Sequence, residues 1–268
     1  MSETPIQVDE SDRDDRRRRL WRRRNILILL STPAALLIIY LTYLTVSSPS
    51  VKYLRDQNPD ATSLMHQRFM EARAEGKEPK RIQEWISIDD VSARILQAVI
   101  MGEDASFYTH NGFDFHEIKE TLRTSFERGR IARGASTITQ QTAKNLFLST
   151  EKSLSRKLKE AILAVRLERA LSKRRILEVY LNVIEWGPDI YGVEAAARVY
   201  FGKHARSLDA AESAALVAMI PNPRRLQPAT NLKSLKVRQE RVLGWMKMAG
   251  HLTEEEYQQA VNQPLRFK

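Results

Sequence analysis

The chain has 268 residues, enough for one large domain or two small ones with a real hydrophobic core. It has no cysteine, which excludes disulfides, thiol nucleophiles and cysteine-based metal sites. The formal net charge of +10 is unevenly placed, because residues 121–175 carry 14 Lys or Arg against 4 Asp or Glu. This basic segment indicates an anionic partner, such as phosphate, nucleic acid or anionic lipid, or else an ordinary solvated basic face.

The first predicted element is a membrane-spanning helix at residues 26–46. These 21 residues include no charged side chain, and as a helix they would be about 31 Å long, enough to cross a bilayer. Seven arginines lie just before them, within residues 16–24. Because basic residues favour the cytoplasmic side, residues 1–25 are predicted to be a basic cytoplasmic tail and the chain after Ser47 to lie outside. A cleaved signal peptide is the alternative, although the apolar segment is long for one.

Residues 47–85 are polar and interrupted by turn signals, which predicts a linker and membrane-proximal segment with some short helix. The next helix is predicted to start near Val91, with Asp89 or Asp90 as its cap. No run alternates as a strand would, so residues 86–268 are predicted to form a nearly all-α domain. Its later helices are predicted at residues 115–128, 137–148, 154–171, 173–183, 193–200, 209–219, 233–248 and 253–262.

Two adjacent acids, Glu103 and Asp104, come at the end of the helix that starts near Val91. Glu103 follows Val99 by four residues and Leu96 by seven, so it continues the apolar face of that helix. A carboxylate partly removed from water has a raised pKa and is a better proton acceptor near neutral pH. Asp104 would orient neighbouring backbone or a basic residue. Two solvated acids at an ordinary helix end are the alternative.

The stretch "RGASTITQQTAKN", residues 133–145, predicts the start of another helix. Thr137 and Gln140 match a capping box, and Gly134 gives the backbone before them freedom. A helix N-terminus offers unpaired N–H groups to a phosphate, and Lys144 would add a full charge. A well-capped polar helix without a ligand is the alternative.

Glu160 opens a third, largely apolar helix and follows two cations, Arg156 and Lys157, by four and three residues. A buried Glu paired with Arg is most often structural. Two carboxylates from separate helices, with cations between them, also describe the acid–base chemistry of sugar transfer.

Together these segments resemble the peptidoglycan glycosyltransferases, glycosyltransferase family 51, and especially the monofunctional, membrane-anchored biosynthetic transglycosylases. The matching motifs, in order, are "EDASFYTHNG", "GASTITQQTAKN", "RKLKE" and "KRRILEVYLN", and the resemblance covers about Val51 to the C-terminus. It implies a mostly α, lysozyme-like two-lobed domain with a membrane-proximal jaw. It also implies an inverting polymerase that transfers the lipid-linked glycan onto the C4 hydroxyl of lipid II. A β-1,4 bond forms and undecaprenyl pyrophosphate is released.

The resemblance implies roles for individual residues. Glu103 would be the base, and Glu160 the second catalytic glutamate, which would hold a divalent cation (Mg²⁺ or Mn²⁺), steer cations or handle a proton. No organic cofactor is implied. Phe107, His110 and Gly112 would shape the loop after the acid pair. The substrate-binding set would be Asp104, Ser136, Thr137, Gln140, Gln141, Lys144, Asn145, Lys152, Arg156 and Lys157.

The expected partners are lipid II, a lipid-linked glycan chain and the membrane, with division or elongation proteins and penicillin-binding proteins as further candidates and no nucleic acid. The expected location is the bacterial inner membrane, with the catalytic domain in the periplasm. A lytic transglycosylase would share the fold and the paired acids, but it does not need the basic segment. A non-enzymatic scaffold would leave the two glutamates unexplained. No transpeptidase domain is expected, because only about 80 residues follow the motifs.

Overall fold

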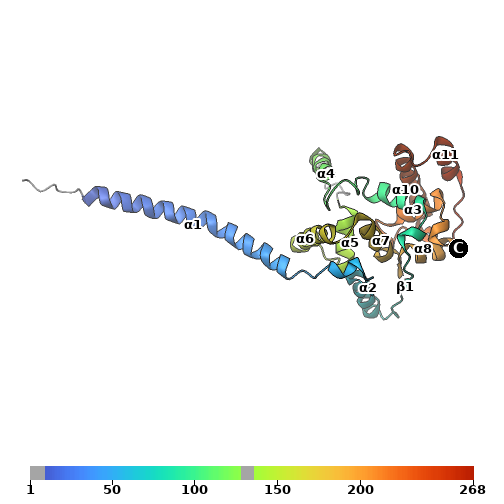
Figure 1. The fold of residues 1–268 in the computed structure, drawn as a ribbon, viewed down its shortest axis with the longest axis horizontal. Coiled ribbons are helices and arrows are strands. Elements are labelled where there is room, and N and C mark those ends of the chain that lie inside the picture. Colours follow the sequence, from blue (N-terminus) through green and yellow to red (C-terminus); the bar gives the residue numbers. More distant parts are fainter. Residues whose placement is uncertain (1–9, 128–135) are drawn as a thin grey trace, which may run out of the picture. The chain divides into compact units, whose positions relative to one another are not determined.

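The computed structural model describes residues 10–127 and 136–268, and the chain divides into two compact units, residues 1–48 and 49–268 (Figure 1). The first unit contains helix α1 (Glu10–Val46), which starts within the predicted basic tail rather than at residue 26. Across the side chains that the structure describes, no helix combines the length and the apolar character needed to cross a membrane. The predicted span at residues 26–46 is therefore unconfirmed.

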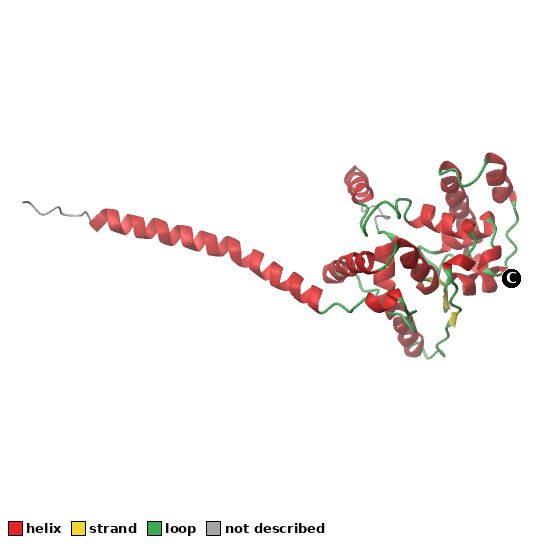
Figure 2. Cartoon of the chain, viewed as in Figure 1, coloured by secondary structure: helices red, strands yellow, loops and turns green. Residues whose placement is uncertain are grey.

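The second unit is mostly helical, as predicted (Figure 2). The predicted helices after residue 115 agree with the observed ones to within two residues, except that α10 starts at Pro228 instead of residue 233. Residue 128, the predicted end of one helix, lies outside the described residues. The helices are α2 (Ser63–Ala74), α3 (Ala93–Glu103), α4 (Phe115–Glu127), α5 (Ile138–Phe147), α6 (Leu154–Ala170), α7 (Lys173–Val183), α8 (Val193–Phe201), α9 (Ala210–Met219), α10 (Pro228–Met248) and α11 (Glu254–Asn262).

The predicted cap of α3 is wrong. Asp89 and Asp90 lie in a short 3-10 turn, and the extended residue Val91 separates them from the helix. The actual cap is Ser92, whose hydroxyl accepts a hydrogen bond from the backbone N–H of Arg94. Serine and aspartate are similarly good caps, so the composition of this stretch could not distinguish them.

Three short strands were not predicted: β1 (Ile82–Gln83), β2 (Glu185–Gly187) and β3 (Ile190–Tyr191). They form a sheet in the order β1-β3-β2, with β1 parallel and β2 antiparallel to β3. Strands of two or three residues are too short for an alternating pattern to be visible in a sequence. The sheet joins the end of the predicted linker to the hairpin that follows α7.

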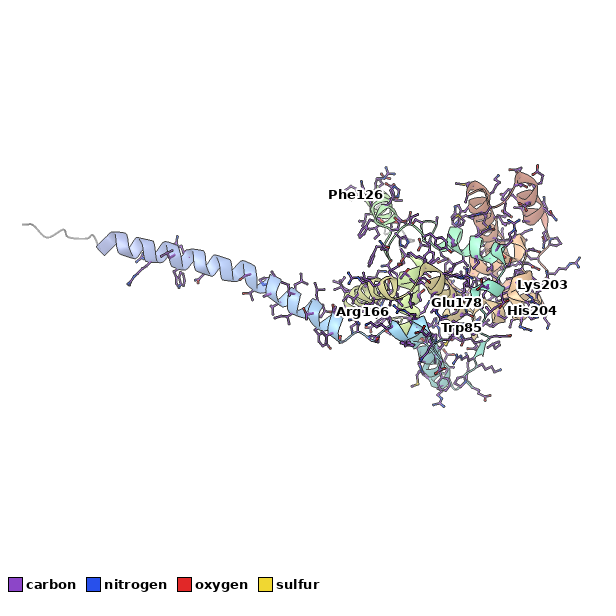
Figure 3. All side chains as sticks on the ribbon, in the orientation of Figure 1. Trp85, Phe126, Arg166, Glu178, Lys203 and His204 are labelled. Carbon is purple, nitrogen blue, oxygen red and sulfur yellow. The ribbon has the colours of Figure 1, made fainter. Side chains whose placement is uncertain are left out.

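Side chains of α7 hold the segment that leads into α3. Asn182 accepts a hydrogen bond from Ile86 N at 2.9 Å and donates one to Ile86 O at 2.9 Å. Glu178 accepts from Ile88 N at 3.0 Å and also pairs with Arg175. Figure 3 labels Glu178 near Trp85, which lies just before this segment. These contacts replace the regular backbone pairing that a loop lacks.

The core of the second unit joins two groups of helices. In one group, α9 packs against α3 and α10, and α10 packs against α11. In the other, α5 packs against α2, α6 and α7. Nearly all of α9 is buried, and the largest fully buried side chains include Trp186 and Tyr180. Burying each such side chain contributes about 1.5–3 kcal/mol, so the ends of α3 and α5 rest on a rigid core.

Gly192, between β3 and α8, supplies a test of this packing. Its φ of +83° is unfavourable for other residues, and an added Cβ would lie 3.1 Å from Asn182 O and 3.5 Å from Glu84 O. Both are backbone atoms that cannot rotate away. Gly192→Ala is expected to lower the free energy of unfolding by about 2 kcal/mol in a urea titration followed by circular dichroism.

Gly244→Ala is the matched control for Gly192→Ala. Gly244 lies within α10, and nothing lies within 4 Å of a Cβ added there. Alanine is the better helix former, so this variant should gain about 1 kcal/mol. Equal effects of the two substitutions would contradict the geometry described for Gly192.

Candidate active site

Glu103 and Asp104, the adjacent acids, line a cleft of about 760 Å³ in the second unit. The end of α3, with Glu103, and the loop after it form one part of the lining, and the start of α4 contributes Glu117. Ser136 and Thr137 line it just before α5, and Trp245 and Met248 line it from the end of α10. Pockets that take small ligands have volumes of this order. The cleft therefore brings together four segments of the sequence, of which the end of α10 is more than 100 residues from the other three.

Glu103 is half-buried and is the last residue of α3. Gln141 on α5 donates a 2.8 Å hydrogen bond from Nε2 to Oε2 of Glu103. Loss of hydration raises the pKa of Glu103 from an ordinary 4.5 to about 7, although the Gln141 hydrogen bond and the charges of Arg238 and Lys144 act to lower it. The structure thus agrees with the apolar seat predicted from helical spacing. A carboxylate with this pKa can accept a proton near neutral pH.

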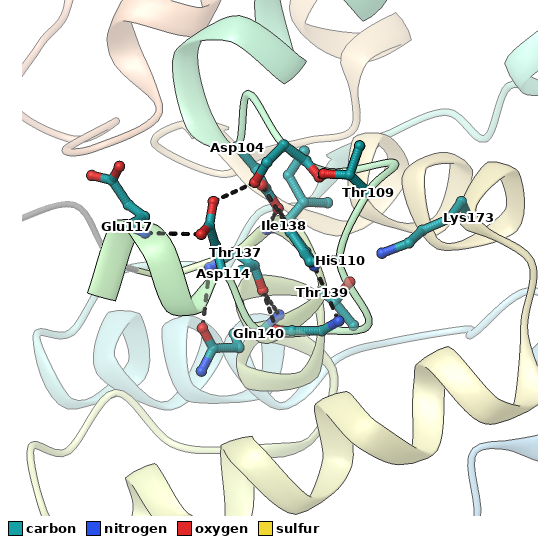
Figure 4. A network of polar contacts seen from close by, with 12 residues as sticks. Asp104, Thr109, His110, Asp114, Glu117, Thr137, Ile138, Thr139, Gln140 and Lys173 are labelled. Atoms are coloured by element: carbon teal, nitrogen blue, oxygen red, sulfur yellow. Dashed lines mark hydrogen bonds and ion pairs between the residues drawn. The ribbon is translucent and has the colours of Figure 1, made fainter. Parts of the chain in front are cut away.

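Asp104 is buried and binds two other parts of the chain (Figure 4). It accepts a hydrogen bond from His110 Nε2 at 2.9 Å and one from the backbone N–H of Ile138 at 2.9 Å. Because Gly112 N donates to His110 Nδ1 at 3.1 Å, the imidazole proton belongs on Nε2, facing Asp104. Ile138 is the first residue of α5, where the helix dipole favours a negative charge. Asp104 therefore orients backbone and a basic residue, as one prediction held, and its substrate-binding role stays a prediction.

The loop after the acid pair is held by the residues predicted to shape it. Phe107 is fully buried, and Lys173 Nζ lies 4.6 Å from the centre of its ring. Gly112 has a φ of +94°, and its carbonyl accepts a 2.7 Å hydrogen bond from Thr137 Oγ1. With His110 bound to Asp104, the loop is attached to the core, to α3 and to the start of α5.

The predicted capping box opens α5. Thr137 Oγ1 accepts from Gln140 N at 3.2 Å, and Gln140 Oε1 accepts from Thr137 N at 3.1 Å. Both side chains are buried, so in this structure they position the helix. Asn145, near the end of α5, is also buried. Gly134, part of the predicted phosphate seat, lies outside the described residues.

Glu160 on α6 lies in a cluster of cations. Arg156 donates to its Oε2 at 2.7 Å, and Lys157 pairs with its Oε1. Lys157 Nζ also donates to Ser136 Oγ at 3.1 Å, which links α6 to the segment before α5. The Glu160 side chain is only 3% exposed. Its carboxylate therefore holds two cations at the edge of the cleft that Ser136 lines.

Lys144 on α5 connects the two glutamates electrostatically. Burial lowers the pKa of Lys144, while the negative charges of Glu160 and Glu103 raise it. Lys144 is therefore close enough to both carboxylates for each to act on its charge. Lys152, the remaining predicted cation, is exposed before α6.

The residues around Glu160 do not suit a divalent cation. Such an ion takes six or more oxygen ligands, whereas each oxygen of Glu160 already pairs with a cation. Within residues 10–127 and 136–268, no group of three His, Asp or Glu could hold a metal ion. A role for Mg²⁺ or Mn²⁺ stays a prediction that this donor set does not support.

The contribution of α10 to the site was not predicted from the sequence. Arg238, Arg241 and Trp245 line a smaller hollow of about 40 Å³ that Glu103 also lines. Their spacing of three, four and seven residues shows that they share one face of a helix. Nothing in the sequence indicates that this face lies against Glu103, because the contact depends on how α10 packs on α3.

The raised pKa of Glu103 predicts a pH-dependent loss of stability. In the folded protein the pKa of Glu103 is about 7, above the ordinary value of 4.5. Between pH 4.5 and 7 the folded protein therefore holds a proton that the unfolded chain releases. The native state therefore loses stability as the pH rises from 4.5 to 7. Glu103→Gln carries no charge, so its stability relative to the wild type should increase by up to about 3 kcal/mol across this range.

This prediction is checked by urea unfolding of both proteins at several pH values. Glu240→Gln is the matched control, because it makes the same substitution at an exposed glutamate on α10. Its stability relative to the wild type should change little with pH, because an exposed carboxylate stays hydrated. A flat difference for Glu103→Gln would mean that Glu103 is not desolvated.

Comparison with known proteins agrees with these features. The sequence model of the family described as "Transglycosylase" matches residues 70–247. The "Biosynthetic peptidoglycan transglycosylase" of Chromobacterium violaceum is 42% identical over 200 residues, which cover 75% of this chain and 88% of that protein. Its namesake from Aromatoleum aromaticum is 48% identical over 170 residues, 63% of this chain and 74% of that protein. "Penicillin-binding protein 1A" of Aquifex aeolicus is 38% identical over 232 residues, 87% of this chain and 32% of that protein. The chain therefore belongs to the transglycosylase family and is a peptidoglycan glycosyltransferase.

Proposed function

We propose that the chain polymerises glycan strands from lipid II, with Glu103 as the general base. Glu103 takes the proton from the C4 hydroxyl of lipid II as that oxygen bonds to C1 of the lipid-linked glycan. The bond from C1 to the pyrophosphate oxygen breaks, and undecaprenyl pyrophosphate leaves with the bonding electrons. The observation that carries this proposal is the half-buried carboxylate of Glu103, with a pKa of about 7, in a cleft of about 760 Å³.

The cations beside the cleft support the departure of pyrophosphate. Negative charge grows on the leaving group in the transition state, and cations already held in place stabilise it without reorganisation. Arg156 and Lys157 are fixed by Glu160, and Lys144 lies within electrostatic reach of both glutamates. The segment that contains these cations, residues 121–175, has an excess of positive charge, which is the sign that favours an anionic leaving group.

The different surroundings of the two glutamates support inversion. A retaining enzyme needs a second carboxylate free to attack the sugar, whereas an inverting enzyme needs one base. Glu160 is 3% exposed and paired through both oxygens, so it is not available as a nucleophile. A single displacement with Glu103 as the base fits this arrangement, and Glu160 then holds the cations.

Helix α4 supports a membrane-proximal jaw in the second unit. None of its described residues is buried, and its exposed apolar side chains include Phe115, Leu122 and Phe126, of which Figure 3 labels Phe126. We further propose that residues 26–46 cross the inner membrane once, with the N-terminus cytoplasmic and the catalytic domain periplasmic. The uncharged stretch and the arginines before it support this topology. Division proteins, elongation proteins and penicillin-binding proteins stay predicted partners.

The proposed reaction is tested by incubating labelled lipid II with the detergent-solubilised chain and with Glu103→Gln. The wild type should make long glycan chains, at a rate that halves as the pH falls to about 7, because protonated Glu103 cannot accept a proton. The variant should be slower by at least about 100-fold, since general base catalysis contributes factors of about 10²–10⁴. Circular dichroism controls for folding.

Other outcomes of this assay favour the alternatives. If the wild type makes no polymer but cleaves isolated peptidoglycan, the lytic reaction is correct. If neither reaction occurs and Glu103→Gln behaves as the wild type in cells, the chain acts as a scaffold.

The proposed topology can be tested because the chain contains no cysteine. Single cysteines introduced as Ser2→Cys and Ser234→Cys report the two sides of the membrane, and Ser234 is exposed on α10. A thiol reagent that cannot cross membranes should label Ser234→Cys in intact spheroplasts and Ser2→Cys only after lysis. Labelling of both, or of neither, before lysis would contradict the topology.

A further inference from the structure

A chain of two hydrogen bonds runs from Glu103 into the core. Gln141 Nε2 donates to Glu103 Oε2 at 2.8 Å, and the hydroxyl of Tyr180 donates to Gln141 Oε1 at 3.4 Å. Tyr180 lies on α7 and is fully buried. Among the described residues, Gln141 is the hydrogen-bond partner of this hydroxyl. The three residues come from α7, α5 and α3, so the contacts span both groups of helices.

The hydroxyl of Tyr180 contacts the amide oxygen of Gln141, so it can select which end of that amide faces Glu103. A primary amide has an accepting oxygen and a donating nitrogen, and a half-turn exchanges them. Burial raises the pKa of Tyr180 well above its ordinary value of 10, so the hydroxyl keeps its proton and needs an acceptor. A flipped Gln141 would leave that buried proton without an acceptor, which is costly. It would also turn the amide oxygen toward the Glu103 carboxylate.

We propose that Tyr180 is a positioning residue for the base: it fixes the amide of Gln141 so that the amide always donates to Glu103 Oε2. This inference rests on the proposed function of Glu103. The hydrogen bond from Gln141 favours the ionised carboxylate, which is the form that accepts a proton. It also fixes the carboxylate plane and leaves Oε1 for the substrate hydroxyl. Among residues 10–127 and 136–268, no hydrogen bond to Oε1 is present.

Removal of the Tyr180 hydroxyl would release this constraint. With phenylalanine at position 180, the amide can turn its oxygen to Glu103 whenever that carboxyl is protonated, because a carboxylic acid donates to an amide oxygen. The protonated form thereby gains a partner that the wild type denies it. Protonation of the base then becomes more favourable, and the active, ionised fraction at neutral pH falls.

The other charges around Glu103 stay in place in such a variant. They are Asp104 just after α3, Lys144 on α5 and Arg238 on α10. None of them is hydrogen-bonded to Tyr180 among the described residues. A change in the pH dependence of the reaction therefore reports the hydroxyl of Tyr180 and its effect through Gln141.

The test is the pH profile of lipid II polymerisation by Tyr180→Phe at saturating substrate. The midpoint of the acid limb of kcat should move up by about half a unit to one unit, the size expected for weakening one hydrogen bond to a carboxylate. At pH 7, where half of Glu103 is ionised in the wild type, kcat should fall by about twofold to fivefold. The KM for lipid II should stay unchanged, because Tyr180 does not reach the cleft.

Tyr200→Phe is the matched control. Tyr200 is also buried, and its hydroxyl donates to another glutamine, Gln227, at 2.7 Å. Loss of this hydroxyl should lower stability without moving the pH profile. A second variant, Gln141→Met, should shift the profile in the same direction as Tyr180→Phe. Adding Tyr180→Phe to Gln141→Met should then cause no further shift, because the connecting amide is gone.

The outcomes separate the inference from the proposed function. If the wild type polymerises lipid II and Tyr180→Phe keeps its pH profile, the positioning role is overturned and the proposed function stands. The same holds if Tyr200→Phe shifts the profile equally, or if Tyr180→Phe shifts it further in the Gln141→Met background. If the folded wild type makes no polymer at any pH, both are overturned.

Discussion

The arrangement of the site depends on one buried carboxylate, that of Asp104. It accepts hydrogen bonds from His110 and from the first backbone N–H of α5, and it follows Glu103 directly in the chain. Each hydrogen bond to a charged group contributes about 1.5–3 kcal/mol, so the end of α3 is firmly attached to α5. Gln141, one turn into α5, can reach Glu103 only while this attachment holds. Asp104 therefore fixes the place of Glu103, the proposed base.

Glu103 is subject to opposing effects, of which desolvation is the largest. Desolvation alone can raise the pKa of a buried glutamate to about 8–9, and strong pairing with a cation would return it to an ordinary value or below. Here one amide hydrogen bond and two more distant cations, Arg238 and Lys144, offset part of the desolvation, which leaves the pKa at about 7. A closer cation would favour the ionised form too strongly for efficient proton transfer. The distance of Arg238 and Lys144 is thus as important as their charge.

The sequence predicts what depends on neighbouring residues along the chain. The spacing of Glu103 from Leu96 and Val99 indicated its apolar seat, and the capping box at Thr137 indicated where α5 starts, because both are properties of single helices. The role of Tyr180 and the α10 lining around Trp245 depend on how separate helices pack, so no local pattern reveals them. The motifs indicated the family, which the comparisons confirmed, whereas the predicted membrane span lies in a separate unit and is unconfirmed.

The two glutamates have different surroundings, which fit the two different roles proposed for them. Glu160 is almost fully buried, and without a partner its charge would be very unfavourable, so it holds Arg156 and Lys157. Those cations would in turn repel each other, and Lys144 as well, without the carboxylate between them. Glu160 is therefore the counter-charge that lets three cations gather beside the cleft. Glu103 has one amide donor and no direct cation among the described residues, so its carboxylate keeps the capacity to take a proton. Under the proposed function, Glu103 takes the proton and Glu160 holds the cations that stabilise the leaving group, and Lys144 lies within electrostatic reach of both carboxylates.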